Sequence, residues 1–421
     1  MRQPTIRPFR AIRYDERVAG GLGLLLAPPY DVSTPGLIEE LHRRSHLNMT
    51  HLEHVRPDPG ENPHELVADR YRRWRADGVL RIDDRPALYR YDHTFRIDGV
   101  ERTRQGIFAA VRLAHWEERI VLPHERTFPG PVAERLGRLR AVRANLSPVY
   151  FLAHDPSGRF AECLHADGER IAETTDPDGE SHLLARIDDE RTIRGIVAAV
   201  AATRLFVADG HHRYEAALAL RDEELDAGPS AGGQEFVLAL IADAADPNVL
   251  ILPTHRLVDG LPDFDRTAIL RSLAARFTLE PAPSPTENAL SGADICHVQF
   301  AEETGWWRLA PRADRDLEIE MPAGRGPAWR RLPAAILEAI VLEQTLGLDT
   351  AALREHVRFT HDAAAATKAV EDGSAQIVFL LPAPSVADLI AVAEEGDRMP
   401  PKSTYFYPKV PAGLVIYDFA T

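Results

Sequence analysis

The chain has 421 residues, too many for one ordinary hydrophobic core, so we expect two or three packed units. It is 45% hydrophobic and 27% charged, and no apolar run is long enough to span a bilayer. The formal charge of −15 opposes binding to nucleic acid or to an anionic membrane. Because the first residues lack the apolar segment of a secretory signal, we expect a cytoplasmic protein whose partners are small molecules.

Hydrophobic periodicity predicts alternating strands and helices along the first half of the chain. The predicted helices are 35–44, capped by Ser33 or Thr34, and 63–78, 131–143, 188–202 and 214–224. The predicted strands are 5–15, 49–54, 87–97, 106–111, 147–152 and 205–208. Asp98-Gly99 lies between two alternating runs and predicts a hairpin, whereas the polar stretch 155–182 indicates a surface connection or short strand pieces.

A Gly- and Ser-rich joint at 228–233 separates this half from a second mixed region. There the predicted strands are 236–242, 249–252, 294–300, 306–309, 317–321, 375–381 and 414–417, and the predicted helices are 266–277, 329–346 and 385–395. The many hairpin signals favour an α+β (mixed α/β) fold over a purely parallel sheet. We expect a core at 1–227 and a C-terminal region at 234–421 that completes the site through 252–256 and 400–409.

The most informative segment is an apolar strand that ends in Asp209-Gly210 and reopens as a helix. Glycine lets the backbone approach a ligand closely, and the N–H groups of a helix start favour an anion. Arg213 could complete a phosphate site, while Asp209 could bind Mg²⁺ or accept a proton. His211 and His212 are adjacent and therefore poor joint ligands for one zinc ion. The alternative is an ordinary helix start capped by Asp209.

A second polar block follows Leu122. His124 and Glu125 could act as a general base or as metal ligands, and Arg135 and Arg138 in the next helix could hold phosphate. An exposed loop with arginines on a helix surface explains the same residues.

Two further polar blocks lie near the ends of C-terminal strands. Lys402 and Lys409 each follow a proline and could neutralise phosphate charge. A rigid surface loop with solvated lysines explains them equally well. The other block comprises residues 252–256, where an apolar strand is expected to end before residue 254. The side chains that we expect to contact a substrate are Thr127, Ser147, Thr254, His255, Arg256, Ser403 and Thr404.

The usual signatures of phosphate and acyl chemistry are absent from the sequence. It contains no Gly-x-x-x-x-Gly-Lys-Ser/Thr loop, no Gly-x-Gly-x-x-Gly after the first strand, no kinase catalytic loop and no Gly-x-Ser-x-Gly elbow. The common folds for those reactions are therefore disfavoured.

Five separate blocks nevertheless resemble one family in their order along the chain. APPYDV at 27–32, LPHERT at 122–127 with NLSPVY up to 150, ADGHHRYEAA at 208–217, LPTHR at 252–256 and PPKSTYFYPK at 400–409 are similar to the bacterial and archaeal domain of unknown function 1015. Its Asp-Gly-His-His-Arg turn resembles the Gly-x-x-Arg phosphate motif of ParB, sulfiredoxin and the free-serine kinases. The chain has histidine where sulfiredoxin needs cysteine, and no helix-turn-helix like that of ParB is evident after residue 226.

The resemblance implies a ParB/sulfiredoxin-like core that binds ATP or ADP with Mg²⁺. Gly210, His211, His212 and Arg213 would then hold the phosphates. The preferred hypothesis is a nucleotide-dependent phosphotransferase acting on a small hydroxyl substrate, with free L-serine or O-phosphoserine favoured and Asp209 or Glu125 as the base. The alternatives are a metal-assisted phosphohydrolase and a non-catalytic nucleotide-binding regulator.

Overall fold

The computed structural model describes residues 3–228, 232–262, 264–283 and 294–420, and it divides into two compact units. Unit 1 comprises Met1–Pro123, Thr127–Leu250 and Pro408–Thr421, and unit 2 comprises His124–Arg126 and Ile251–Tyr407. The division differs from the expected one at 228–233, because strand β12 (Phe236–Asp243) pairs with strands of unit 1. Residues 229–231 of the expected joint lie outside the described residues.

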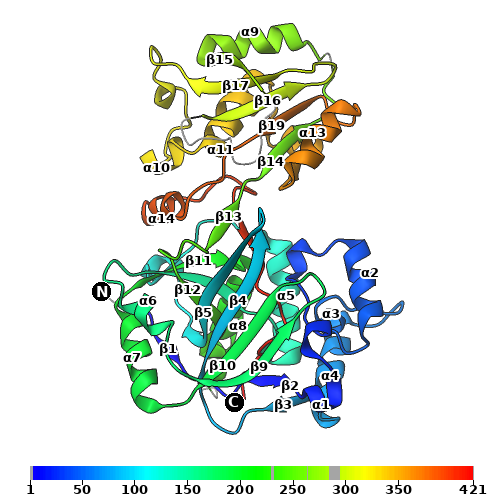
Figure 1. The fold of residues 1–421 in the computed structure, drawn as a ribbon, viewed down its shortest axis with the longest axis vertical. Helices are drawn as coiled ribbons and strands as arrows, with labels where there is room; N and C mark the ends of the chain where they lie inside the picture. Colours follow the sequence, from blue (N-terminus) through cyan, green and yellow to red (C-terminus); the bar gives the residue numbers. More distant parts are fainter. Residues whose placement is uncertain (1–2, 229–231, 263, 284–293, 421) are drawn as a thin grey trace. The chain divides into compact units, whose positions relative to one another are not determined.

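Within its described residues, unit 1 forms a mixed nine-stranded sheet in the order β6-β11-β8-β12-β5-β4-β10-β9, with β1 beside β5 (Figure 1). Only the pairs β11–β6 and β12–β8 are parallel, which makes the fold mixed α/β as predicted. The strands of unit 1 are β1 (Ile6–Arg7), β2 (Ile12–Tyr14), β3 (Leu80–Ile82), β4 (Leu88–Ile97), β5 (Val100–Arg112), β6 (Val121–Leu122), β7 (Ala144–Asn145), β8 (Val149–His154), β9 (Glu169–Thr175), β10 (Ser181–Ile187), β11 (Arg204–Asp209), β12 and β21 (Tyr417–Asp418).

The helices of unit 1 include one that begins directly after β11. Helix α8 packs against β8 and β12, and α5 packs against both α4 and α8. The helices are α1 (Glu16–Ala19), α2 (Pro35–Arg44), α3 (Thr50–Glu53), α4 (Pro63–Ala76), α5 (Pro129–Val142), α6 (Arg159–Cys163), α7 (Glu190–Ala201) and α8 (His211–Ala227), with short 3-10 turns at Leu22–Leu24, Tyr30–Val32, Trp116–Glu118 and Gly233–Glu235. Because β8 and β12 are central strands, their side chains are buried almost throughout.

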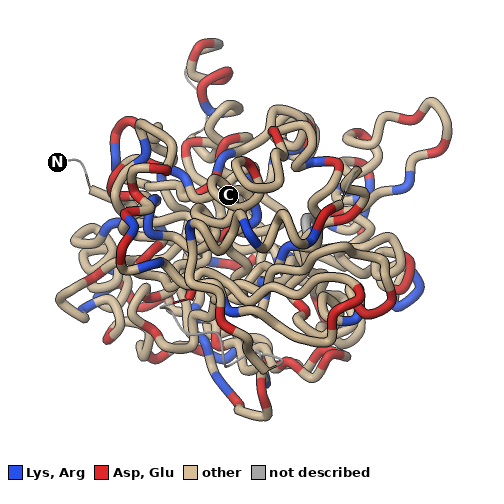
Figure 2. Tube along the Cα trace, turned by 90° about the horizontal axis from the view of Figure 1, so that it is seen from above, with Lys and Arg blue, Asp and Glu red and all other residues tan. Residues whose placement is uncertain are grey.

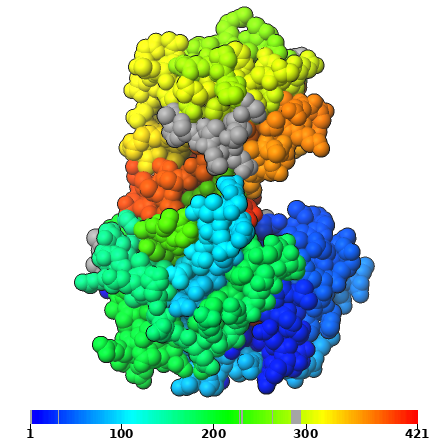
Figure 3. Space-filling view, viewed as in Figure 1, coloured from blue at the N-terminus to red at the C-terminus, as the bar shows by residue number. Residues whose placement is uncertain are grey.

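The predicted Asp-Gly hairpin is confirmed. Ile97 pairs with Val100, and Asp98 and Gly99 have φ angles of 51° and 75°, as a two-residue turn with left-handed residues requires. The stretch 155–182, expected as a surface connection or short strand pieces, contains the seven-residue strand β9 and also the short helix α6, and it leads into β10. Strand β10 pairs with β4 of the hairpin, and Figure 3 shows these two regions, cyan and green, side by side on one face.

Unit 2 is built on an antiparallel six-stranded sheet in the order β15-β17-β16-β19-β14-β18. Helix α13 packs against β19 and β14, and Leu257, Trp306, Ala366 and Val378 lie in the buried core between them. The strands are β13 (Leu250–Leu252), β14 (His255–Val258), β15 (Phe277–Ala282), β16 (Cys296–Phe300), β17 (Trp306–Pro311), β18 (Val357–Thr360), β19 (Ile377–Leu380) and β20 (Tyr405–Tyr407). The helices are α9 (Arg266–Arg276), α10 (Pro327–Arg330), α11 (Pro333–Ile336), α12 (Thr350–His356), α13 (Ala363–Glu371) and α14 (Val386–Glu394), with a 3-10 turn at Leu317–Ile319 and a π-helical segment at Leu337–Thr345.

Two short strands were predicted wrongly because short apolar runs do not distinguish strand from helix. Residues 49–54 form α3, whose first turn is fixed when the Asn48 side chain accepts the Thr50 N–H at 2.9 Å. Residues 317–321 begin a 3-10 turn, where the Asp316 side chain accepts the N–H of Glu318.

Proline explains two further differences from prediction. The helix expected at 329–346 is broken into α10, α11 and the π-helical segment, because Pro333 has no N–H to donate and begins a new turn. The strand expected at 5–15 is split into β1 and β2 around Pro8.

Charged positions of both signs are interspersed along the chain, as Figure 2 shows. Among the described helices, none combines the length and the apolar composition that a membrane crossing needs.

A glycine to alanine pair tests the packing of the C-terminal segment in unit 1. A Cβ atom on Gly233 would lie 1.9 Å from the backbone oxygen of Phe419, whereas a Cβ on Gly195, in α7, meets nothing within 4 Å. We expect Gly233→Ala to lower the free energy of unfolding by about 2–3 kcal/mol, because overpacking against backbone forces a shift. Gly195→Ala should raise it by about 0.5–1 kcal/mol, since alanine favours a helix over glycine. Urea titration of both variants measures the difference, and equal stabilities would contradict the packing described.

Candidate functional site

The Asp-Gly turn lies at the carboxyl end of β11, where Gly210 adopts the left-handed conformation (φ 92°, ψ 30°) and α8 begins at His211. Strands β11 and β6 are parallel, so the chain leaves both at the same edge of the sheet. Glycine is required at this position for two reasons. Its φ disfavours side chains, and a Cβ would lie 2.9 Å from Cζ of Arg213.

Asp209 is held between two cations. Its Oδ2 lies 2.6 Å from Nη2 of Arg213, and its Oδ1 lies 2.6 Å from Nζ of Lys409. All three side chains are largely buried, with exposed fractions of 9–13%. Arg213 also donates Nη1 to the carbonyl oxygen of Pro148. We call Asp209, Arg213 and Lys409 the ion triad; it brings three predicted site residues together in unit 1.

The two histidines of the turn have different surroundings. His211 is buried, whereas His212 is half-buried and stacks on Phe128 with 6.2 Å between ring centroids. The Nε2 of His212 accepts the Phe128 N–H at 3.1 Å, so this nitrogen carries no proton. Thr127 donates its hydroxyl to Oε2 of Glu215 at 2.5 Å, which ties the predicted substrate residue to the first turns of α8.

The predicted phosphate ligands Arg135 and Arg138 are also buried, and they meet a carboxylate that the sequence did not indicate. Both place Nη1 3.0 Å from Oε2 of Glu53. Burial alone would raise the pKa of Glu53, but Arg138, Arg135 and a hydrogen bond from Ser147 outweigh it and hold the pKa below its usual value. We call Glu53, Arg135 and Arg138 the Glu53 cluster.

A small cavity of about 30 Å³ lies beside the Glu53 cluster. Arg213 and the predicted substrate residue Ser147 line it together with the three cluster residues. Unit 1 therefore gathers Ser147, Arg135, Arg138 and Arg213 around one cavity, where three arginines accompany the one carboxylate of Glu53.

In unit 2, the loop residues His124 and Glu125 meet Thr404. The Oγ1 of Thr404 donates to Oε1 of Glu125 at 3.2 Å and lies 2.8 Å from Nε2 of His124. Because the hydroxyl has one proton and gives it to Glu125, Nε2 of His124 is the donor in the second bond. The predicted base Glu125 is thus oriented by a hydrogen-bonded chain.

The strand expected to end before residue 254 does so, because β13 ends at Leu252. His255 and Arg256 begin a second strand, β14, and they are buried there because β14 pairs with β18 and β19. Burial lowers the pKa of His255 to about 4 and that of Arg256 to about 10, so the imidazole is neutral and the guanidinium charged at pH 7. Thr254, Arg256 and Ser403 line a cavity of about 20 Å³, whereas Lys402 is exposed.

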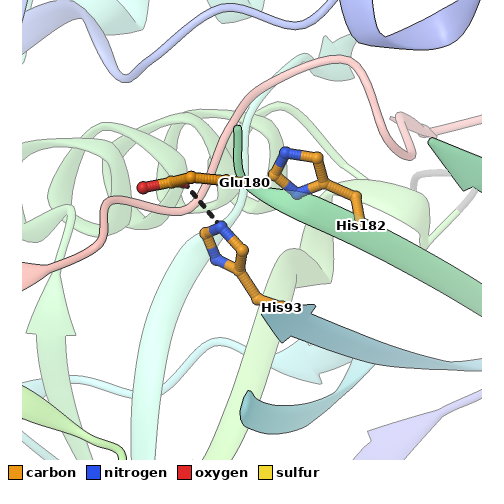
Figure 4. A group of neighbouring side chains, drawn as sticks. All are labelled: His93, Glu180 and His182. Atoms are coloured by element: carbon orange, nitrogen blue, oxygen red, sulfur yellow. Dashed lines mark hydrogen bonds and ion pairs between the residues drawn. The ribbon is translucent and has the colours of Figure 1, made fainter. Parts of the chain in front are cut away.

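A largely buried polar cluster formed by β4, β10 and the residue that precedes β10 was not predicted from the sequence. His93 Nε2 lies 2.7 Å from Oε2 of Glu180, and the ring of His182 lies 4.6 Å from that of His93 (Figure 4). Among the described residues this is the group of three whose ligand atoms are close enough to hold a metal ion, and it does not include Asp209. The available signal was the position of His93 in β4, on the same alternating buried face as Tyr91 and Phe95.

Comparison with known proteins identifies the family. Residues 6–335 match the model of the family described as "Protein of unknown function (DUF1015)". The chain belongs to this family. No curated protein matches the chain.

Three solved structures resemble parts of the chain. A conserved hypothetical protein from Pyrococcus furiosus is 14% identical with a TM-score of 0.36, and the alignment covers 73% of this chain and 93% of that one. A free serine kinase in complex with AMP is 13% identical with a TM-score of 0.35, covering 72% and 86%. SbnI with a C-terminal truncation, from Staphylococcus aureus, is 12% identical with a TM-score of 0.35, covering 72% and 88%.

Removal of the Glu53 charge tests the Glu53 cluster. Glu53→Gln leaves Arg135 and Arg138 buried without their shared carboxylate, so we expect the free energy of unfolding to fall by about 3–5 kcal/mol at pH 7. Because the folded pKa of Glu53 is lowered, this stabilisation is present above its unfolded pKa and is lost as the pH falls through the folded pKa. Glu134→Gln is the matched control. Its carboxylate contacts the same arginines but is 39% exposed, so it should cost at most about 1 kcal/mol.

Glu180 gives a pH dependence of the opposite sign. Burial, with the neighbouring Asp176, raises the pKa of Glu180 to about 7. The stabilisation is therefore complete below the unfolded pKa and is lost as the pH rises through 7. After allowance for partial exposure, we expect wild-type protein to lose about 1–2 kcal/mol more than Glu180→Gln between pH 5 and 8. Urea titrations at both pH values measure this. Glu101→Gln, at an exposed site on β5, should keep the wild-type slope.

Proposed function

We propose that this protein is a nucleotide-dependent phosphotransferase that acts on a small hydroxyl substrate, with free L-serine or O-phosphoserine as the preferred partner. The anion would lie at the start of α8, and the ion triad would be part of its binding site. The resemblance of the Gly210-to-Arg213 turn to the Gly-x-x-Arg phosphate motif supports the same placement.

The observation that carries the proposal is the charge balance at this helix start. Two cations, Arg213 and Lys409, converge on one carboxylate at the N-terminus of a 17-residue helix. The helix dipole adds a partial positive charge at the same end. These positive groups lie where a phosphate group would accept their hydrogen bonds. A substrate phosphate would compete with Asp209 for the same donors.

In this proposal the nucleotide, and not the protein, would supply the ligands of the magnesium ion. Mg²⁺ prefers carboxylate oxygens and water, but both oxygens of Asp209 lie 2.6 Å from cations. The arrangement therefore does not suit Asp209 as a magnesium ligand, and we assign it the role of orienting Arg213 and Lys409. Magnesium would accompany the nucleotide phosphates and screen their charge.

The same contacts bear on the choice of base. Asp209 is stabilised as an anion by two cations and is therefore a poor proton acceptor. Glu125 accepts a hydrogen bond from the hydroxyl of Thr404, and a carboxylate has acceptor sites for several donors. We accordingly propose Glu125 as the general base that takes the proton from the attacking hydroxyl, with Thr404 holding its orientation.

Product analysis separates this proposal from its two alternatives. Purified protein is incubated with ATP or ADP, Mg²⁺ and a panel of hydroxyl amino acids, and the products are followed by phosphorus NMR. Phosphoserine that forms only with nucleotide supports the kinase. Release of inorganic phosphate without an acceptor would instead indicate a phosphohydrolase, and nucleotide binding without turnover would indicate a regulator.

Arg213 tests the phosphate site directly. Arg213→Gln removes a charged donor at the helix start, so we expect nucleotide affinity to fall several-fold, measured by isothermal titration calorimetry. Arg140→Gln is the control, because Arg140 is exposed on α5 and pairs with Glu223. A folded Arg213→Gln variant with unchanged affinity would remove Arg213 from the site.

Glu125 tests the assignment of the base. Glu125→Gln should lower kcat by about 10²–10⁴-fold with little change in KM, because the amide cannot accept the proton. Glu117→Gln changes an exposed carboxylate on the 3-10 turn Trp116–Glu118 and should leave kcat unchanged. An active Glu125→Gln variant would refute the assignment.

A further inference from the structure

The buried polar cluster of unit 1 has the composition of a metal site. His93 and His182 are essentially inaccessible, whereas the side chain of Glu180 is 20% exposed (Figure 4). Asp176 adds a second carboxylate, with Oδ2 3.4 Å from Nε2 of His182. Two imidazoles and two carboxylates would suit zinc.

The hydrogen bonds at His93 oppose that interpretation. Nη2 of Arg104 lies 3.1 Å from Nδ1 of His93, and a guanidinium can only donate. Nδ1 is therefore unprotonated, and the ring proton resides on Nε2, where it is donated to Glu180 at 2.7 Å. A metal on Nε2 would require the loss of that proton while Arg104 still occupies Nδ1. Burial and Arg104 both hold the pKa of His93 well below its usual value, so the ring stays neutral.

The second terminal nitrogen of Arg104 contacts the C-terminal segment. Arg104 is 2% exposed, its Nη1 donates to the carbonyl oxygen of Pro408 at 2.9 Å, and its Cζ lies 5.0 Å from the centre of the Tyr150 ring. Pro408 directly precedes Lys409, whose ammonium contacts Asp209. One planar guanidinium thus joins the neutral His93 ring to the backbone that presents Lys409.

We propose that Arg104 is a positioning residue that places Lys409 on Asp209, and that the His93–Glu180 pair holds Arg104 in place instead of binding a metal. Glu180 accepts a hydrogen bond from the Nε2–H of His93, which leaves Nδ1 as the acceptor for Arg104. The planar guanidinium then fixes the Pro408 carbonyl. This contact also fixes the backbone from which the Lys409 side chain extends. The functional consequence rests on the proposed phosphotransfer, but the placement of Lys409 does not.

Selective lysine labelling tests this placement because the chain has only three lysines, at 368, 402 and 409. Lys368 and Lys402 are exposed and serve as internal references. The protein is acetylated with an N-hydroxysuccinimide ester, and the rate at each lysine is followed by peptide mass spectrometry. In wild-type protein we expect Lys409 to react more slowly than both references.

Arg104→Gln should raise the Lys409 rate several-fold and leave the two reference rates unchanged. Arg96→Gln is the control, because Arg96 is exposed on the same hairpin and pairs with Glu101. If Arg104→Gln fails to fold, Arg104→Lys replaces it, since an ammonium keeps the charge but lacks the planar fork. An unchanged Lys409 rate in a folded variant would overturn the proposal.

Rescue at His93 separates positioning from simple packing. Asparagine can place an oxygen acceptor near the Nδ1 position, whereas leucine cannot. His93→Asn should therefore keep Lys409 protected, and His93→Leu should expose it. Equal labelling of Lys409 in both would refute the role of Nδ1.

Equilibrium dialysis against zinc chloride tests the metal alternative. We expect no stoichiometric binding that depends on His93 and His182, and one zinc per chain that is lost in His93→Asn would overturn the proposal. In the phosphotransfer assay, Arg104→Gln should raise KM for nucleotide several-fold with a smaller change in kcat. If the wild-type protein shows no phosphotransfer, the proposed function fails. The labelling result still decides whether Arg104 holds Lys409 on Asp209.

Discussion

The ion triad is the interaction on which the surrounding structure of unit 1 depends. A carboxylate this deeply buried is stable only if it is paired, and Asp209 has Arg213 on one oxygen and Lys409 on the other. Arg213 can fold back onto Asp209 only because Gly210 has no Cβ. The end of β11, the start of α8 and the segment after Pro408 are therefore fixed by one set of charges. A change in any of them weakens an ion pair that holds Asp209.

Several buried arginines serve a common structural purpose in this acidic protein. They donate to the backbone carbonyls of residues outside the regular strands: Arg104 to Pro408, Arg138 to Leu52 and Glu53, Arg213 to Pro148 and Arg256 to Thr254. A guanidinium carries five donors and can bind a carbonyl and another acceptor at once. These side chains thus satisfy backbone groups that would otherwise be buried without hydrogen bonds. The loops that carry the candidate site residues are held in this way.

The sequence was informative where structure is decided locally. Asp98-Gly99 predicts its hairpin because only a few residues tolerate two successive left-handed positions, and Gly210 predicts a turn for a related reason. The partners of charged residues were not accessible in the same way. Glu53 was expected in a strand, so its contact with two arginines more than 80 positions away had no signal in the spacing. Arg104 likewise meets Pro408 across 304 positions, a pairing that only the assembled sheet brings about.

The chemical difference between the two cations of the ion triad bears on how a phosphate would enter. Arg213 is fixed by two acceptors, Asp209 and the Pro148 carbonyl, and its planar group cannot rotate toward a ligand without losing both. Lys409 presents a compact ammonium on a flexible four-carbon stem, which can exchange one oxygen for another. The chain has 46 arginines and three lysines, so lysine at this position is unusual for the protein. An anion that arrives at the start of α8 would therefore draw Lys409 from Asp209 first, while Arg213 keeps the carboxylate in place.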